Sequence, residues 1–321
     1  MQNENKMSAA AYIRAYRPWH SLYNVRLRLE TNTGGDDHQR ELSLIETLLN
    51  NEMLLLIFSR LPIASVGACQ VVCKQWRTVG ETSSLWQAAC KDAFRLTPQE
   101  TNERLLFKVY NSNWKVMFLD RPHLRFEGIY VARNTYIRTG ATEWKVRNPV
   151  HLVAYYRYCR FFPDGTFLYR TTPEVVGKVA KTMQKPTAGA SSCSSRKSQQ
   201  LSGDTGLHYG RYKIDNDKLY TAVRYHNSTS TEVRSRMRIR STVRGAHNRL
   251  DINSIVSYDR EDGSIVPMMM GNPEEEEELG DGVEQRRYSR GLAPYAFIPF
   301  DAVQTHVLNL TVDQMDVWIP G

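Results

Sequence analysis

Residues 49–94 read LNNEMLLLIFSRLPIASVGACQVVCKQWRTVGETSSLWQAACKDAF and form three short apolar segments separated by two turn signals. In the first segment Asn50 and Asn51 are N-cap candidates. The apolar residues that follow recur at the spacing of one helical face: Met53, Leu54, Ile57 and Phe58. The pair Leu61-Pro62 ends this helix, because the residue before a proline is disfavoured in the helical region and proline is tolerated at a helix start.

A second helix is expected to begin at Pro62. Its apolar residues step by three and four positions: Val66, Cys69, Val72, Cys73 and Trp76. Ser83 or Ser84 caps a third helix, in which Leu85 faces Ala89. Three helices in about forty-five residues make a small core, and units of this size usually need a disulfide, a metal or a partner to be stable. The sequence therefore predicts that these helices bind a partner.

The order of residues in this stretch resembles the F-box, the module that docks a substrate receptor onto a cullin–RING ubiquitin ligase through an adaptor. The residues that carry the resemblance, and that it implies for adaptor binding, are Leu49, Glu52, Ile57, Phe58, Leu61, Pro62, Val72, Cys73, Trp76, Leu85 and Trp86. The chain departs from the family at Asn50, where the family's opening Leu-Pro has proline. The alternative is an ordinary three-helix subdomain packed against the rest of the chain.

The periodicity of the sequence changes from helical to alternating near Arg125. Pro163, Asp164 and Gly165 are the residues of a tight turn between two strands. About eight short strands with hairpin connections, and no helix long enough for a βαβ crossover, predict an antiparallel barrel or sandwich. We therefore expect an α+β chain: an N-terminal three-helix F-box, a short helical linker and a C-terminal β-barrel-like domain of lipocalin type.

Composition divides the 321 residues into an arm, a helical part and a strand-rich part. Two polar insertions interrupt the strands near 177–204 and 271–290, and both are expected to be disordered because they have too few apolar residues to offset the entropy of ordering. The predicted organisation is a flexible arm over 1–40, the F-box over 41–96, a helical linker over 97–122 and the barrel-like domain over 123–321.

The strand-rich part also resembles a known group. The segments RFEGIYVARNTYIR, YYRYCRFFPDGTFLYRTTPE and AFIPF are similar to the C-terminal region of the F-box only protein 9 and Hrt3 group, which has plant relatives. Animal members carry a TPR-type helical repeat before the F-box. One such repeat needs about 34 residues and a stable stack about three repeats. About forty-eight residues precede the F-box here, so we expect this module to be absent.

The charge and the motifs of the sequence argue against several classes of function. The net charge of +8 raises the alternative of a basic RNA-binding protein, but the excess is spread along the chain without a recognition helix or stacking motif. The sequence contains no nucleophile elbow, phosphate loop, HExxH or CxxC motif, so we expect a non-catalytic protein without a metal or cofactor. No apolar run is long enough to span a membrane. The five cysteines are an odd number and include no CxxC pair, so we expect reduced thiols and a reducing compartment, the cytoplasm or nucleus.

Two surfaces of the predicted barrel are candidates for substrate binding. Tyr156 and Tyr158 belong to an aromatic-rich strand, which either fills the barrel or lines a pocket for an apolar or peptide ligand. Four arginines alternate along another strand and share one face: Arg234, Arg236, Arg238 and Arg240. That face is either a solvated exterior or a surface for an acidic segment. The leading hypothesis is a substrate receptor with adaptor, cullin and RING partners and an unknown protein substrate; a small apolar ligand-binding barrel is the second alternative.

Overall fold

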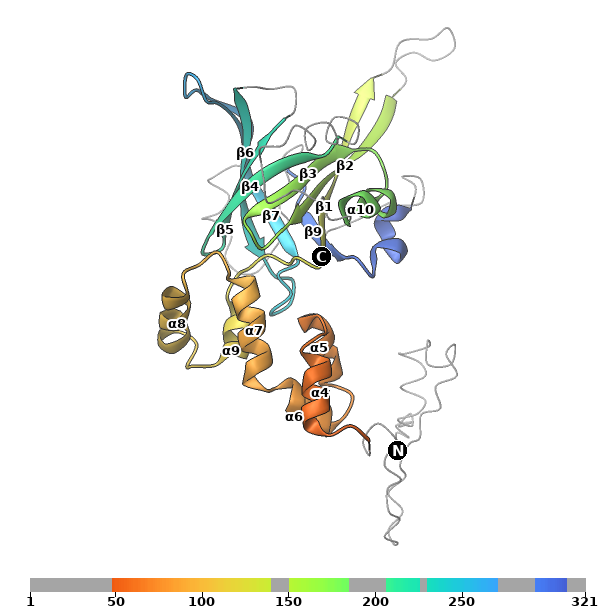
Figure 1. Ribbon diagram of the computed structural model, residues 1–321. Coiled ribbons are helices and arrows are strands. Elements are labelled where there is room, and N and C mark those ends of the chain that lie inside the picture. The colour runs from red at the N-terminus through yellow and green to blue at the C-terminus, as the bar shows by residue number, and fades with distance from the viewer. Residues whose placement is uncertain (1–47, 140–149, 185–205, 226–229, 271–291, 311–321) are drawn as a thin grey trace, which may run out of the picture. The chain divides into compact units, whose positions relative to one another are not determined.

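The computed structural model describes residues 48–139, 150–184, 206–225, 230–270 and 292–310 (Figure 1). The predicted arm over 1–40 and the insertion at 271–290 lie outside these residues. Among the described residues six helices precede the first strand: α4 (Asn51–Phe58), α5 (Ile63–Cys69), α6 (Lys74–Gly80), α7 (Ser83–Ala93), α8 (Gln99–Lys108) and α9 (Trp114–Asp120). None of the described helices combines the length and the apolar character needed to cross a membrane.

The segment predicted as one helix after Pro62 is two helices, α5 and α6. Cys73 has an extended backbone (φ −153°, ψ 171°) and is the N-cap of α6, where its sulfur accepts a hydrogen bond from the Trp76 N–H at 3.5 Å. The prediction of a single helix was wrong because the apolar residues keep a step of three or four across the turn. A cap residue with extended backbone at Cys73 interrupts the helix without disturbing that spacing.

The strand-rich part is a closed antiparallel barrel. The strands are β1 (Gly128–Thr139), β2 (Val150–Phe161), β3 (Thr166–Thr172), β4 (His208–Asp215), β5 (Lys218–Arg224), β6 (Thr231–Arg240), β7 (Arg249–Asp259), β8 (Ile265–Met270) and β9 (Tyr295–Pro299). The neighbours run β6-β5-β4-β3-β2-β1-β9-β7, and pairing of β6 with β7 closes a ring of eight strands. The predicted barrel and the α+β class are confirmed.

One wall of the barrel is incomplete in the part of the chain that the structure describes. β9 pairs with β1 only over Gly128–Val131, although β1 continues to Thr139. On the other side β9 pairs with β7 at Arg249 and Leu250, and β8 adds to the same edge of β7 further along. The ring therefore closes at the end where β1 begins, and the opposite end, where β1 stops at Thr139, is the open end.

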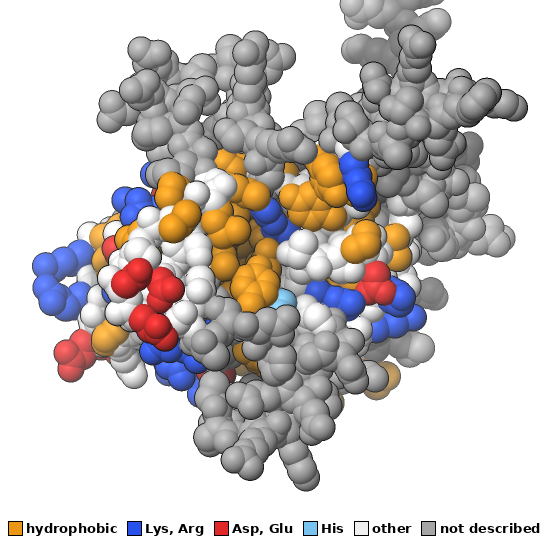
Figure 2. All heavy atoms as spheres, turned by 90° about the horizontal axis from the view of Figure 1, so that it is seen from above, with side chains coloured by type: hydrophobic (Ala, Val, Ile, Leu, Met, Phe, Trp, Pro, Cys, Tyr) orange, Lys and Arg blue, Asp and Glu red, His pale blue; other side chains and the backbone are white. Residues whose placement is uncertain are grey.

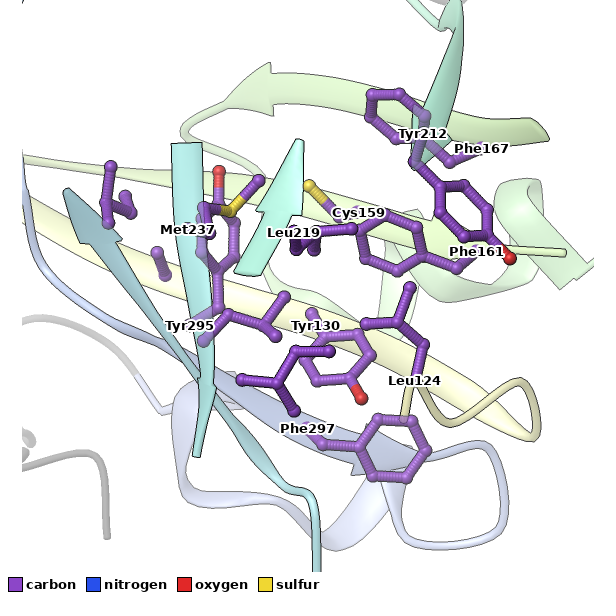
Figure 3. Close-up of a cluster of buried hydrophobic side chains, with 14 of the residues drawn as sticks. Leu124, Tyr130, Cys159, Phe161, Phe167, Tyr212, Leu219, Met237, Tyr295 and Phe297 are labelled. Atoms are coloured by element: carbon purple, nitrogen blue, oxygen red, sulfur yellow. The ribbon is translucent and has the colours of Figure 1, made fainter. Parts of the chain in front are cut away.

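Aromatic side chains fill the interior near the closed end (Figure 3). The rings of Phe161 and Phe167 stack with centroids 5.3 Å apart, and Tyr130 meets Phe297 edge-on at 5.0 Å. The buried Tyr130 hydroxyl donates to the His247 carbonyl at 3.1 Å. Such rings pack tightly in offset or edge-on pairs, so this half of the barrel is a core and not a pocket.

A second core lies on the outside of the barrel, under α10 (Val176–Gln184) and the short 3₁₀ turns η2 (Val303–Thr305) and η3 (Val307–Asn309). The buried residues of α10 are Val176, Val179, Ala180 and Met183. The prediction of disorder from residue 177 was therefore wrong up to Gln184, and residues 185–204 lie outside the described part. The helical spacing of these four residues was hidden by the polar composition of the whole insertion.

Candidate functional site

The helices of the predicted F-box expose several large apolar side chains to solvent. The exposed set comprises Met53, Leu56, Ile57, Leu61, Val71 and Val72, and Val71 is 80% exposed. They lie on α4 and on the two turns that flank α5, and we call this set the apolar strip. Leu54 and Phe58 on the opposite side of α4 are buried. Several exposed apolar side chains on neighbouring elements are typical of a protein–protein interface.

The predicted adaptor-binding residues fall into three groups. Those exposed are Glu52, Ile57, Leu61, Pro62 and Val72; those half-buried are Leu49, Cys73 and Trp76; those buried are Phe58, Leu85 and Trp86. The buried three support the helices from within and do not reach a partner. The prediction omitted Met53, Leu56 and Val71, although the all-round apolar character of α4 was a signal for the first two.

Aromatic and amide contacts hold α4 and α6 together beneath the strip. Phe58 and Trp76 meet edge-on with ring centroids 5.6 Å apart. The Gln75 side-chain amide donates to the Asn51 side-chain oxygen at 3.1 Å, which joins the start of α4 to α6. Because these contacts fix the helices relative to each other, the exposed side chains form a preorganised surface.

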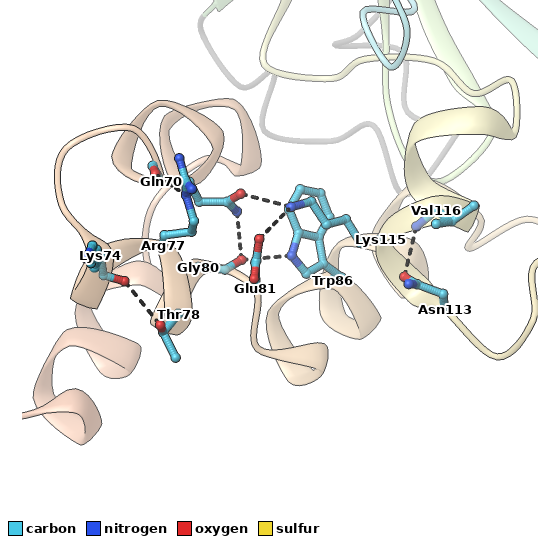
Figure 4. A network of polar contacts seen from close by, with 10 residues as sticks. All are labelled: Gln70, Lys74, Arg77, Thr78, Gly80, Glu81, Trp86, Asn113, Lys115 and Val116. Atoms are coloured by element: carbon cyan, nitrogen blue, oxygen red, sulfur yellow. Dashed lines mark hydrogen bonds and ion pairs between the residues drawn. The ribbon is translucent and has the colours of Figure 1, made fainter.

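The carbonyl oxygen of Gly80 anchors the turn between α5 and α6 (Figure 4). It accepts hydrogen bonds from Trp86 Nε1 at 2.9 Å and from Gln70 Nε2 at 2.8 Å. Lys115 of α9 donates to Gln70 Oε1 at 2.9 Å and lies 3.8 Å from a Glu81 carboxylate oxygen. A Cβ atom at Gly80 would come within 2.6 Å of the Gln70 side chain. The turn that presents Val71 and Val72 is therefore fixed from below.

A mixed polar and aromatic contact joins α9 to the loop between β6 and β7. Arg244 donates to both carboxylate oxygens of Asp120, at 2.6 and 2.8 Å. Beside this ion pair the buried ring of His123 lies 4.5 Å from Phe118 and 4.1 Å from His247, measured between centroids. Burial, reinforced by His247, lowers the pKa of His123 to about 3, so its ring is neutral.

The two tyrosines predicted for substrate binding are buried in the second core. Tyr156 is 3% exposed and Tyr158 is fully buried under α10. The Tyr158 hydroxyl donates to the Glu174 carbonyl at 2.6 Å. Both rings pack in this core under α10, so neither is accessible to a cargo. The prediction did not anticipate that α10 covers this face.

The four arginines of β6 share the outer face of the barrel, as the alternation predicted. Three of them have carboxylate partners: Arg234 with Glu232 at 3.3 Å, Arg238 with Asp217 at 2.8 Å and Arg240 with Asp251 at 3.8 Å. For Arg236 the structure gives a cation–π contact with Tyr220, 5.6 Å from the ring centroid. The face is thus basic but partly neutralised by its own carboxylates.

The described residues offer no metal-binding group of three or more His, Cys, Asp or Glu side chains. Cys69, Cys73, Cys90 and Cys159 are free, and Cys193 lies outside the described part. Burial raises the pKa of Cys90 and of Cys159 to about 12. Since the thiolate is the reactive form, these two thiols are inert packing residues.

Comparison with known proteins agrees with this architecture. A family model described as F-box-like matches residues 51–92, so the helices and their exposed strip define an F-box protein. A second model, described as the F-box only protein C-terminal region, matches residues 103–321. The chain belongs to the family of F-box only proteins that share this C-terminal region.

Two curated relatives are F-box proteins from yeasts. The F-box protein pof7 of Schizosaccharomyces pombe is 28% identical over 137 residues, which are 39% of this chain and 38% of the relative. The F-box protein HRT3 of Saccharomyces cerevisiae is 33% identical over 72 residues, 22% of this chain and 21% of the relative. The matches therefore span well under half the length of these relatives, and they agree with the predicted Hrt3-type resemblance.

Proposed function

We propose that this chain is a substrate-recognition subunit of an SCF-type (Skp–cullin–F-box) ubiquitin ligase. The observation that carries the proposal is the apolar strip, which is exposed on helices that are fixed from beneath. Membership of the F-box only family and the F-box relatives support it. The strip binds the S-phase kinase-associated adaptor protein, which connects the chain to the cullin and RING subunits.

In this role the chain carries out no bond chemistry. It raises the local concentration of a substrate lysine at the conjugating enzyme, an effect that depends on holding the cargo at a defined distance. Contacts such as the Asp120–Arg244 pair between α9 and the barrel loop suit this task. Free cysteines are consistent with a protein that acts in the cytoplasm or nucleus.

The barrel is the proposed cargo-binding part, and the basic outer face of β6 is one surface for an acidic segment. The two alternative functions have less support. The cavity among the described interior side chains is about 20 Å³, space for one water and not for an apolar ligand. The carboxylates beside Arg234, Arg238 and Arg240 reduce the charge that an RNA backbone would meet.

Co-purification with the adaptor tests the proposal. The variant Ile57→Asp/Val72→Asp places two charges on the strip without touching the core, and we expect at least about a thirtyfold loss of adaptor affinity, since each interface anchor contributes about 2 kcal/mol. The matched control is Phe107→Asp/Val109→Asp, two equally exposed apolar residues at the end of α8. Unchanged adaptor binding by the folded strip variant would refute the proposal.

A further inference from the structure

Towards the open end of the barrel the inward-facing positions include an amide, a guanidinium and tyrosine hydroxyls. Tyr130 and Ala132 of β1 and Cys159 and Phe161 of β2 face the interior core. Side chains alternate along a strand, so the next inward positions are Asn134 on β1 and Arg157 and Tyr155 on β2. We call Asn134, Tyr155, Arg157, Tyr169 and Tyr225 the mouth cluster.

Asn134 is the unusual member of the mouth cluster. Its side chain is only 3% exposed, and neither its amide nitrogen nor its amide oxygen has a hydrogen-bond partner. Buried polar groups are nearly always hydrogen-bonded, because an unpaired one lowers stability. A side chain that needs one acceptor and one donor at the same place is therefore suited to a ligand that supplies both.

A buried cation lies next to this amide. Arg157 is 6% exposed, its guanidinium is 5.7 Å from the centre of the Tyr155 ring, and Nη2 donates to the Met269 sulfur at 3.4 Å. Burial alone would lower the pKa of Arg157, but the surrounding tyrosines, Tyr295 foremost, raise it above its ordinary value. The guanidinium therefore stays positively charged although it is buried.

The register of β1 and β2 brings the amide and the cation together. Ala132 pairs with Arg157 and Asn134 pairs with Tyr155, so Asn134 and Arg157 are diagonal neighbours on the inner face. Diagonal neighbours have Cβ atoms roughly 7 Å apart. A planar carboxylate between the two side chains is within hydrogen-bond reach of both, and its two oxygens match the fork of a guanidinium.

The interior limits how far a ligand enters. Below the mouth cluster the cavity is about 20 Å³, and Cys159 and Tyr295, which line it, are buried. Seen from above, Figure 2 shows Lys or Arg atoms enclosed by hydrophobic side chains. The interior below the mouth cluster therefore has no room for a bulky ligand.

We propose that the open end of the barrel binds the C-terminal carboxylate of an extended peptide. Arg157 holds the carboxylate, the Asn134 amide N–H donates to a carboxylate oxygen, and the Asn134 carbonyl accepts the last peptide N–H of the ligand. A peptide end satisfies both amide atoms of Asn134. An ionised alkyl carboxylate supplies acceptors but no donor, and would leave the Asn134 oxygen unpaired.

This inference deepens the proposed function. Only the identification of the bound peptide as cargo rests on that function, and the binding itself does not. Binding is measured on the purified full chain without any ligase subunit, so its failure is distinguishable from loss of adaptor binding. The probe is a mixture of N-acetylated random hexapeptides with free C-termini, retained by equilibrium dialysis and quantified by mass spectrometry. The comparison probes are the same mixture with amidated C-termini, and octanoate.

The free peptides should be retained at least about tenfold better than the amidated ones, because amidation removes a charge-assisted hydrogen bond. Octanoate should bind more weakly than the best free peptides. Equal retention of free and amidated peptides would overturn the proposal. Retention of octanoate without any free peptide would overturn the peptide assignment and leave a small carboxylate as the ligand.

Substitutions at Asn134 separate a binding role from a structural one. Asn134→Leu should abolish the preference for free C-termini without lowering the melting temperature, because it removes two unpaired polar atoms. Asn134→Asp should do the same by placing a carboxylate beside Arg157. The control Thr221→Val changes another buried polar residue of the barrel interior, on β5, and should retain the preference. A lower melting temperature of Asn134→Leu with unchanged peptide retention would show that Asn134 is structural.

Discussion

The indole Nε1 of Trp86 donates a hydrogen bond to the carbonyl oxygen of Gly80 at 2.9 Å, inside the F-box helices. The same carbonyl accepts from Gln70, whose neighbours Val71 and Val72 are among the exposed residues of the apolar strip. A buried tryptophan on α7 thus supports an exposed turn between α5 and α6. The family signature at Trp86 has a structural explanation: the buried ring positions the exposed apolar strip without being part of it.

Replacing Trp86 tests this support. Trp86→Phe removes the N–H donor and part of the ring, and we expect a loss of about 2 kcal/mol of unfolding free energy. Urea unfolding followed by circular dichroism measures it. The exposed Lys91→Ala on the same helix is the control and should change stability by less than about 0.5 kcal/mol. An unchanged midpoint for Trp86→Phe would contradict the support role.

The helix α10 should be essential to the barrel. Met183→Ala removes a fully buried side chain from the second core, and we expect a cost of about 2–5 kcal/mol. Lys181→Ala, an exposed position on the same helix, should be neutral. Thermal unfolding of both variants decides between a packed helix and a dispensable insertion, since a dispensable insertion would give equal melting temperatures.

Stability should fall as the pH drops below about 6.5. His123 is neutral in the folded chain down to about pH 3, whereas in the unfolded chain it takes up a proton below its ordinary pKa of 6.5. The unfolded state then binds more protons, so acid favours unfolding by about 2 kcal/mol at pH 5. Denaturant unfolding at pH 7.5 and 5 measures this.

The variant His123→Phe is the control for the pH effect. Phenylalanine suits a site between the rings of Phe94 and Phe118, and it cannot take up a proton. The pH dependence should then shrink to the contributions of His247 and His306, whose pKa values are also lowered by burial. An equal slope for both proteins would exclude His123 as the source.

The basic face of β6 should bind acidic peptides through Arg236. Arg236→Glu should weaken binding of a fluorescent hexaglutamate peptide by about fivefold at low salt. The effect should vanish at high salt, because exposed charges are screened over about 8 Å even at physiological ionic strength. Arg104→Glu, the same charge change at an exposed position on α8, is the control. Equal affinities for the two variants would assign Arg236 to the solvated exterior.

The sequence by itself determined the features that depend on local backbone chemistry. Leu61-Pro62 ends α4 because proline restricts the residue before it. The turn at Pro163–Gly165 forms as predicted, with Gly165 at φ 86° and Asp164 accepting the Thr166 N–H at 3.0 Å. Alternation of apolar residues likewise predicted the strands and the outward arginines of β6.

Only the tertiary structure decided which apolar residues are buried in the core and which are exposed. Ile57 and Phe58 are adjacent and equally apolar, yet Phe58 packs on Trp76 and Ile57 remains exposed. The spacing of Cys73 and Trp76 fits a continuous helix, and only the extended cap at Cys73 ends it. The pairing of β1 with β2 places Asn134 beside Arg157, although they are distant in sequence. Burial and long-range register are properties of the folded chain, because they depend on which segments cover each other and not on local spacing.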